Sequence, residues 1–177
     1  MNVALHALAG GAIAHASFRV AVIPSAKPNG MTLATAAVAG LASHGLLDWL
    51  RHSYPLPSRL DVVLALALSG MWLALVHPRL RPLFGGALAA SFLPDVVDHL
   101  PRLLHFNSPL PTPVFPWHSP AWSGSLYPAA EIPAGSHLVA LEVGDNRLVS
   151  ILNHAVVILI GLVCVFLGRS AFSNPPP

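Results

Sequence analysis

The sequence predicts an all-α fold, a polytopic bundle of membrane helices with four to five spans and a long proline-rich loop. Hydrophobic residues make up 54% of the 177-residue chain and charged residues only 9%, and the mean hydropathy is +0.65. A soluble domain carries about 25% charged residues, because water must wet its surface. We therefore expect lipid to surround a single helical domain at residues 1–170.

The first three spans occupy the N-terminal part of the chain, because a bilayer-crossing helix needs roughly 20 mostly apolar residues. Residues 3–23 are rich in Ala and Gly and lack the positive n-region of a cleaved signal peptide, so we expect them to stay as a span. Residues 31–50 follow a Lys-Pro-Asn-Gly turn. Residues 60–76 form a clean apolar run with Asp61 at its start, where a carboxylate favours the helix dipole.

Two further spans complete the predicted bundle. Residues 83–97 are the weakest candidate, because their uninterrupted apolar run stops at Pro94-Asp95. Residues 148–167 are the strongest candidate and contain the run VVILIGLVCVFLG. Pairs of glycines, which are typical of close helix contacts in lipid, stand at Gly10-Gly11 and Gly85-Gly86.

The segment at residues 100–147 interrupts this helical pattern. Prolines exclude a continuous helix over most of it, and they stand at positions 101, 109, 111, 113, 116, 120, 128 and 133. Aromatic residues such as Trp117 and Trp122 favour the headgroup level of a membrane. We expect this loop to lie over the bundle as a lid, and residues 171–177 to form a frayed tail.

Threading the chain through five spans separates its charges by membrane face. All seven acidic residues fall on one face, together with most of the ten histidines. The other face receives five of the nine Lys and Arg residues, which are Arg19, Lys27, Arg79, Arg81 and Arg169. By the positive-inside rule this acid-free face is assigned to the cytoplasm. The chain has no basic run, so nucleic acid is not an expected partner.

Short motifs of His and Asp stand at predicted helix ends on the acidic face. His44 and Asp48 are four residues apart, and so are Asp95 and His99. This spacing places both members of a pair on one face of a helix. A third motif in the loop, Pro-Trp-His-Ser, contributes His118.

Imidazole nitrogens and carboxylate oxygens are the ligands of a divalent cation such as zinc, and a catalytic site leaves one position open for water. The metal lowers the pKa of that water toward about 7. Ionisable groups in membrane spans cost roughly 2.5–3.5 kcal/mol each and are functional candidates by default. The candidate metal ligands are His44, Asp48, Asp95, His99, His118 and His6. Asp98 is the candidate general base, or a partner that orients a ligand.

Other interpretations of the same residues stay open. Asp48, Asp61 or Asp98 taken singly is equally well explained as a solvated residue at a span end, and His6 as a hydrogen bond between helices. A cation or proton transporter would continue polar residues down its helices, and the third and fifth spans have almost none. A non-catalytic membrane scaffold would use the same cluster only to fix helix register.

Four motifs in residues 1–120 resemble those of one family. Leu-His-Ala at His6, before a Gly-Gly pair, is similar to an early T-H with a glycine-rich span. His44 to Asp48 is similar to an H-x-x-x-D pair, and LPDVVDH at 93–99 to an L-P-D-x-D-H motif with one residue inserted. His118-Ser119 matches the tail of an H-R-G-x-T-H-S motif. The chain thus resembles the YdjM-like family of predicted membrane-bound metal-dependent hydrolases.

The resemblance implies a multi-pass protein of the bacterial inner membrane that uses a divalent metal, with zinc expected and manganese the alternative. A site at headgroup level favours a lipid-like ester or phosphodiester as substrate, so the expected partners are the lipid bilayer and such a substrate. The arginine and first histidine of the fourth motif are absent. A degenerate, non-catalytic member of the family is therefore the alternative to an enzyme.

Overall fold

The computed structural model describes residues 3–21, 28–50, 52, 58–99, 101, 113–119, 122–123, 126–127, 139–140 and 145–167. The described fold is all-α apart from one pair of two-residue strands. Its long helices are α1 (Val3–Ala21), α2 (Gly30–Trp49), α3 (Ser58–Leu75), α4 (Arg81–Asp98) and α6 (Asp145–Leu167). The short elements are the 3-10 helices η1 (Pro78–Leu80) and η2 (Pro116–His118) and the strands β1 (Leu126–Tyr127) and β2 (Val139–Ala140). The two strands pair in parallel.

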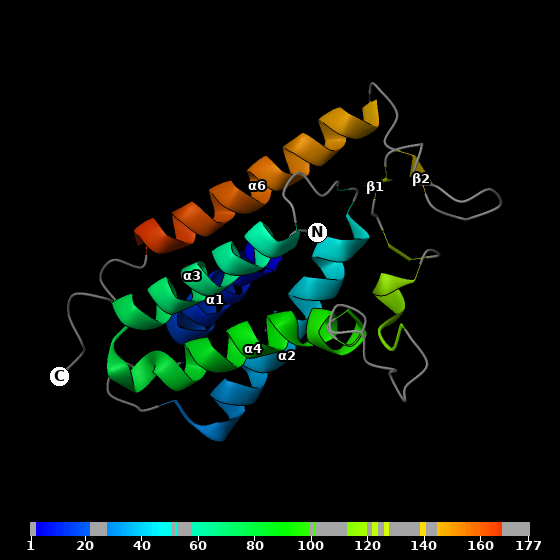
Figure 1. Cartoon of the computed structure of the whole chain (residues 1–177). Helices are drawn as coiled ribbons and strands as arrows, with labels where there is room; N and C mark the ends of the chain where they lie inside the picture. The colour runs from blue at the N-terminus through cyan, green and yellow to red at the C-terminus, as the bar shows by residue number, and fades with distance from the viewer. Residues whose placement is uncertain are drawn as a thin grey trace.

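Helix α1 lies at the centre of the bundle, where it contacts α2, α3, α4 and α6 (Figure 1). The most extensive contact is between α2 and α4, and α6 packs chiefly along α1. The start of α1 lies close to the C-terminal ends of α2 and α4. The buried His and Asp side chains gather at this end of the bundle. Asp61 near the start of α3 accepts hydrogen bonds from the first backbone N–H groups of α1, at Val3 and Ala4.

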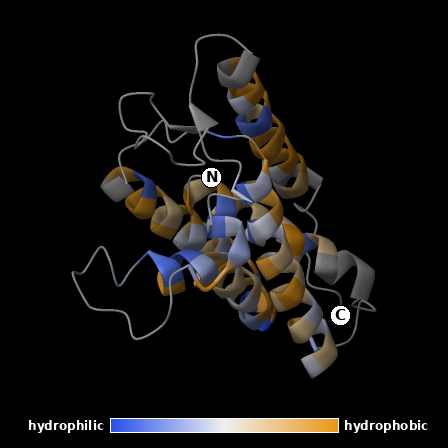
Figure 2. Ribbon diagram, turned by 90° about the vertical axis from the view of Figure 1, so that its right-hand side faces the viewer, coloured by the Kyte–Doolittle hydropathy of each residue, from blue (hydrophilic) through white to orange (hydrophobic). Residues whose placement is uncertain are grey.

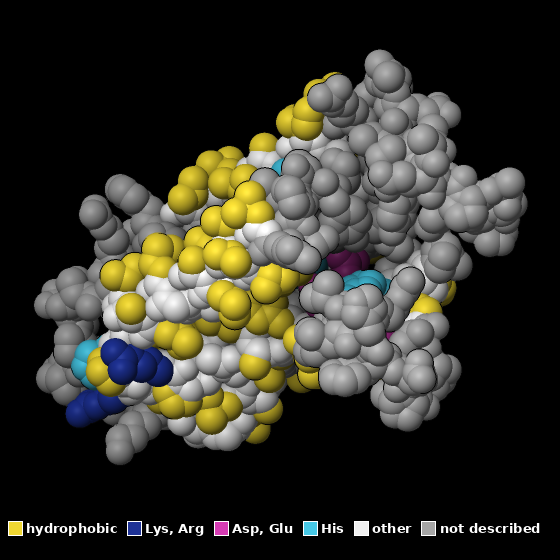
Figure 3. All heavy atoms as spheres, viewed as in Figure 1, with side chains coloured by type: hydrophobic (Ala, Val, Ile, Leu, Met, Phe, Trp, Pro, Cys, Tyr) yellow, Lys and Arg dark blue, Asp and Glu magenta, His cyan; other side chains and the backbone are white. Residues whose placement is uncertain are grey.

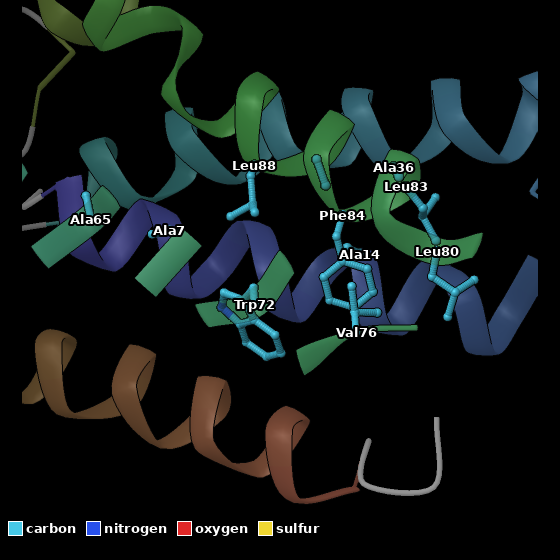
Figure 4. Packing of buried hydrophobic residues seen from close by; sticks show 11 residues of the cluster. Ala7, Ala14, Ala36, Ala65, Trp72, Val76, Leu80, Leu83, Phe84 and Leu88 are labelled. Carbon is cyan, nitrogen blue, oxygen red and sulfur yellow. The ribbon is translucent and has the colours of Figure 1, made fainter. Parts of the chain in front are cut away.

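Small residues let these helices approach closely around one large aromatic pair. Trp72 and Phe84 lie with ring centroids 5.7 Å apart, and they share one core cluster with alanines of α1, α2 and α3 (Figure 4). A Cβ added at Gly11 would stand 2.2 Å from Trp72, and one at Gly40 would stand 2.5 Å from the Ala87 carbonyl oxygen. These glycines are therefore required by the packing of the helices.

The two predicted glycine pairs behave differently. Gly10, like Gly11, makes a close helix contact, since an added Cβ would stand 2.7 Å from the Ser91 hydroxyl. The same prediction for Gly85 and Gly86 is wrong, because an added Cβ meets no described atom within 4 Å at either position. A glycine pair alone does not indicate which face of a helix it lies on.

Helix α4 is longer than its apolar run suggested. It passes through Pro94 and ends at Asp98, so that η1 and α4 together form an apolar stretch at Pro78–Asp98. A proline removes one intrahelical hydrogen bond and bends a helix, but neighbouring elements can compensate. Here Pro94 is buried. The carbonyl of Ser91, one turn earlier, accepts a hydrogen bond from His44.

Two of the described helical stretches, Gly30–Trp49 and Pro78–Asp98, are long and apolar enough to cross a membrane by length and composition. Three shorter apolar stretches are Val3–Ala16, Leu60–Leu75 and Leu148–Cys164. Hydrophobic residues recur along the helices (Figure 2) and cover much of the molecular face in Figure 3. On α3 and α6 most large apolar side chains are exposed, for example Leu66 at 65% and Leu159 at 61%.

The described charged side chains lie at opposite ends of the bundle. Arg79 and Arg81, where α4 begins, are at one end with His77, and the carboxylates of the His and Asp cluster are at the other (Figure 3). The separation predicted from the threading therefore holds for the side chains that the structure describes.

Candidate metal centre

Helix α2 contributes the first two side chains of a polar cluster near its C-terminal end. His44 is fully buried and Asp48 is 4% exposed. Because they are four residues apart on one helical face, Nε2 of His44 lies 2.9 Å from Oδ2 of Asp48. The sequence predicted this pair.

The segment at residues 113–119 brings a second imidazole to the same point. Asp98, at the end of α4, accepts hydrogen bonds from the backbone N–H groups of Val114 (2.7 Å) and Phe115 (3.0 Å). The Trp117 ring lies against Gly45 of α2, where an added Cβ would stand 3.0 Å from it. These contacts hold η2 across the ends of α2 and α4 and place His118 beside His44.

Three atoms then meet at almost equal distances. Nε2 of His118 lies 3.0 Å from Nε2 of His44 and 3.0 Å from Oδ2 of Asp48. Asp95 Oδ1 lies 3.6 Å from Nε2 of His118 and 3.9 Å from Nε2 of His44. His44, Asp48, Asp95 and His118 each offer one ligand atom, and these four atoms lie within 4.8 Å of one another.

Hydrogen bonds on the far side of each ring fix the position of its proton. Nδ1 of His44 lies 2.6 Å from the Ser91 carbonyl oxygen, and Nδ1 of His118 lies 2.7 Å from Oδ2 of Asp98. A carbonyl or an ionised carboxylate can only accept, so both Nδ1 atoms carry the hydrogen and donate it. In a neutral imidazole the other nitrogen, Nε2, then presents a lone pair.

The centre of the cluster therefore gathers two nitrogen lone pairs and a carboxylate oxygen about 3.0 Å apart. Because these lone pairs repel one another, a cation must lie between the atoms or a proton must be bound to one of them. Ligand atoms of a tetrahedral zinc ion, bound at about 2.0–2.1 Å, stand roughly 3.3 Å from one another. Donation of the second ring N–H to a carbonyl or a carboxylate is the usual arrangement of metal-bound histidines. These side chains can hold a divalent metal ion.

A proton is the competing cation at this position. Burial alone would lower the pKa of His118, but its hydrogen bonds to Asp48 and Asp98 outweigh burial and raise the pKa. Binding of a metal by Nε2 must displace that proton, because a ligating imidazole is neutral on this nitrogen.

Two predicted ligands lie beside this group rather than within it. The His6 ring stacks on His44 with centroids 3.9 Å apart, and its Nε2 lies 3.3 Å from Oδ1 of Asp48 without hydrogen-bond geometry. The His99 side chain is 55% exposed, and its Nε2 lies 3.9 Å from Oδ1 of Asp95. His99 therefore lies at the solvent edge of the cluster.

Asp98 was predicted as a general base or as a partner that orients a ligand. Its two oxygens accept three hydrogen bonds, from Val114, Phe115 and His118. The side chain is buried, at 2% exposure for the residue. This geometry favours the orienting role, because both oxygens of Asp98 already accept hydrogen bonds from residues 113–119 and the oxygen nearest His118 accepts two.

Sequence reasoning missed three features of the site. Asp61 lies in the first turn of α3, as predicted, and it also caps α1, the helix that carries His6. The Ser91 carbonyl gave no signal, since any residue type supplies one. His52, which no motif singles out, is fully buried with Nδ1 2.6 Å from the Leu50 carbonyl oxygen, and burial lowers its pKa to about 3.

The lid prediction for residues 100–147 is testable only in part. Residues 113–119 lie on the cluster, whereas most of the remaining loop, with His105, His137, Glu131 and Glu142, lies outside the described residues. The sequence matches no family model, and neither the curated proteins nor the solved structures searched gave a match to the chain.

Proposed function

We propose that this protein is a membrane-bound metal-dependent hydrolase whose cation is held by His44, Asp48, Asp95 and His118. The convergence of two Nδ1-protonated imidazoles on one carboxylate oxygen carries the proposal, because this arrangement presents lone pairs to a common point. A divalent cation there would activate water for attack on an ester or a phosphodiester. The resemblance to the YdjM-like family supports the same reaction class.

The chain crosses the membrane with four to five spans in this proposal, and the cluster lies at one interface. Two helices of sufficient length and composition support it. The exposed apolar side chains of α3 and α6 support it as well, because soluble monomers rarely expose contiguous apolar patches larger than a few hundred Å². The bacterial inner membrane is the location that the family resemblance implies.

The chain's own groups would each have one task in such a reaction. Asp98 and the Ser91 carbonyl orient the two imidazoles. Asp95, less buried than Asp48, lies toward the edge where His99 is exposed, so substrate would approach from that edge. At headgroup level the accessible esters are those of lipids, and a lipid-like ester or phosphodiester is the proposed substrate.

The second candidate is a non-catalytic membrane protein in which a proton, not a metal, joins the cluster. The raised pKa of His118 favours this alternative. The two candidates differ in one measurable property, the metal content of the folded protein.

Elemental analysis of the detergent-purified full chain tests the proposal. Wild type is expected to hold a stoichiometric divalent metal, with zinc favoured and manganese the alternative, and Asp95→Asn is expected to lose most of it. Asp61→Asn is the matched control, because it changes another buried aspartate that contacts none of the four ligands. Wild type without metal after incubation with zinc would overturn the proposal. Bound metal without hydrolysis of a lipid ester or phosphodiester would refute the enzymatic part.

A further inference from the structure

His6 and Asp48 carry a feature that one cation does not explain. Asp48 presents its two oxygens to different imidazoles: Oδ2 lies 2.9 Å from His44 and 3.0 Å from His118, while Oδ1 lies 3.3 Å from Nε2 of His6. The His6 and His44 rings are stacked with an interplanar angle of 14°. Two parallel rings thus address the two oxygens of one carboxylate.

Polar atoms of His6 and Asp95 are buried without a hydrogen-bond partner among the described residues. His6 is fully buried, and neither of its ring nitrogens has a hydrogen-bond partner among the described residues. Oδ2 of Asp95 is also buried without a described partner. Buried unpaired polar atoms are rare in folded proteins, and each one calls for an explanation such as a bound ion or water.

The charges of the cluster lead to the same conclusion. Asp48, Asp95 and Asp98 bring three carboxylates to the cluster. With all three carboxylates ionised and the imidazoles neutral, one divalent cation leaves this cluster with a net negative charge. A second divalent cation reverses that sign and leaves the site ready for an anionic group.

We propose a second divalent-cation site on Nε2 of His6 and Oδ1 of Asp48, so that Asp48 bridges two cations. The remaining positions on the second cation are filled by water or by substrate oxygens. The inference rests on the proposed function, since it needs the first cation at His44, Asp48, Asp95 and His118. Paired cations can clamp both the attacking and the leaving oxygen of a phosphoryl group, so a phosphodiester is the substrate class that this inference names.

Metal counting on His6→Phe tests the second site. Phenylalanine keeps a ring against His44 but supplies no ligand nitrogen, and His15→Phe is the matched control on the same helix, also at a buried histidine. The full chain, purified in detergent and loaded with Mn²⁺, is expected to hold two ions per chain in wild type and in His15→Phe, and one ion in His6→Phe.

Electron paramagnetic resonance of the same samples gives an independent readout. Two Mn²⁺ ions that share a carboxylate are expected to give a spin-coupled spectrum, and His6→Phe the six-line spectrum of an isolated ion. One ion in all three proteins would overturn the second site and leave the first in place, as would two ions in His6→Phe. No bound ion in wild type would overturn the proposed function together with this inference.

Discussion

Asp98→Asn is the substitution that tests how the site is oriented. The carboxylate accepts from Val114 N–H through Oδ1 and from Phe115 N–H and His118 Nδ1–H through Oδ2. An asparagine keeps one accepting oxygen and places an NH₂ group at the other position. If the NH₂ faces His118, that ring must accept on Nδ1 and carry its hydrogen on Nε2, where it can no longer bind a metal.

The opposite orientation of the amide has its own cost, because the NH₂ then faces the Val114 N–H at a position where Oδ1 lies 2.7 Å away. It also weakens the bond to His118, since an uncharged acceptor replaces a carboxylate. Loss of such an orienting partner lowers metal affinity by roughly 10- to 100-fold, or about 1.4–2.7 kcal/mol of binding free energy.

Competition with a chromophoric zinc chelator measures this difference on the detergent-purified chain. Asp98→Asn is expected to bind zinc at the His44–Asp48–Asp95–His118 site 10- to 100-fold more weakly than wild type. Asp61→Asn is the control, because Asp61 also accepts two backbone N–H bonds but contacts none of these ligands. An unchanged zinc affinity in Asp98→Asn would refute the orienting role and the tautomer assigned to His118.

Two further predictions concern stability. Gly40→Ala would place a Cβ 2.5 Å from the Ala87 carbonyl oxygen, so α2 and α4 must separate, at a cost of about 1–3 kcal/mol of stability. The control Gly86→Ala, where an added Cβ meets no described atom within 4 Å, should be neutral or slightly stabilising. Equal melting temperatures of the two variants would contradict this packing. Burial lowers the pKa of His52 from 6.5 to about 3, so the unfolded chain binds a proton that the folded chain does not, and stability present above pH 6.5 is lost as the pH falls. At pH 5 this loss is about 2 kcal/mol, and the drop in melting temperature between pH 7.5 and pH 5 should shrink in His52→Gln; an undiminished drop would argue against it.

The positions of the helices were largely predictable, because long apolar runs leave few alternatives. The predicted stretches 31–50 and 60–76 correspond to α2 and α3 within a few residues. Span number was less predictable, since only two of the described helices meet the length and composition of a membrane span. The length of α4 was underestimated at Pro94 for a physical reason. A proline readily ends a helix in water, whereas inside a packed bundle neighbouring groups can compensate for the hydrogen bond that it removes.

The pairing of His44 with Asp48 was predictable because both belong to one helical turn. The convergence of Asp95, Asp98 and His118 on that pair follows from how α4 and residues 113–119 pack on α2, and no local pattern encodes this packing. His99 shows the same limit, because its spacing from Asp95 resembles that of His44 from Asp48 but its side chain faces solvent. Spacing predicts which residues share a face, and tertiary packing decides which face is buried.

X-ray absorption at the zinc edge, on the zinc-loaded full chain, tests most directly whether these imidazoles hold a metal. The expected spectrum has only nitrogen and oxygen neighbours at about 2.0–2.1 Å and outer-shell scattering from at least two imidazoles. Replacement of His118 by Ala should remove one imidazole from that outer shell. A sulfur neighbour at about 2.3 Å, or a spectrum without imidazole scattering, would contradict a metal centre at His44 and His118.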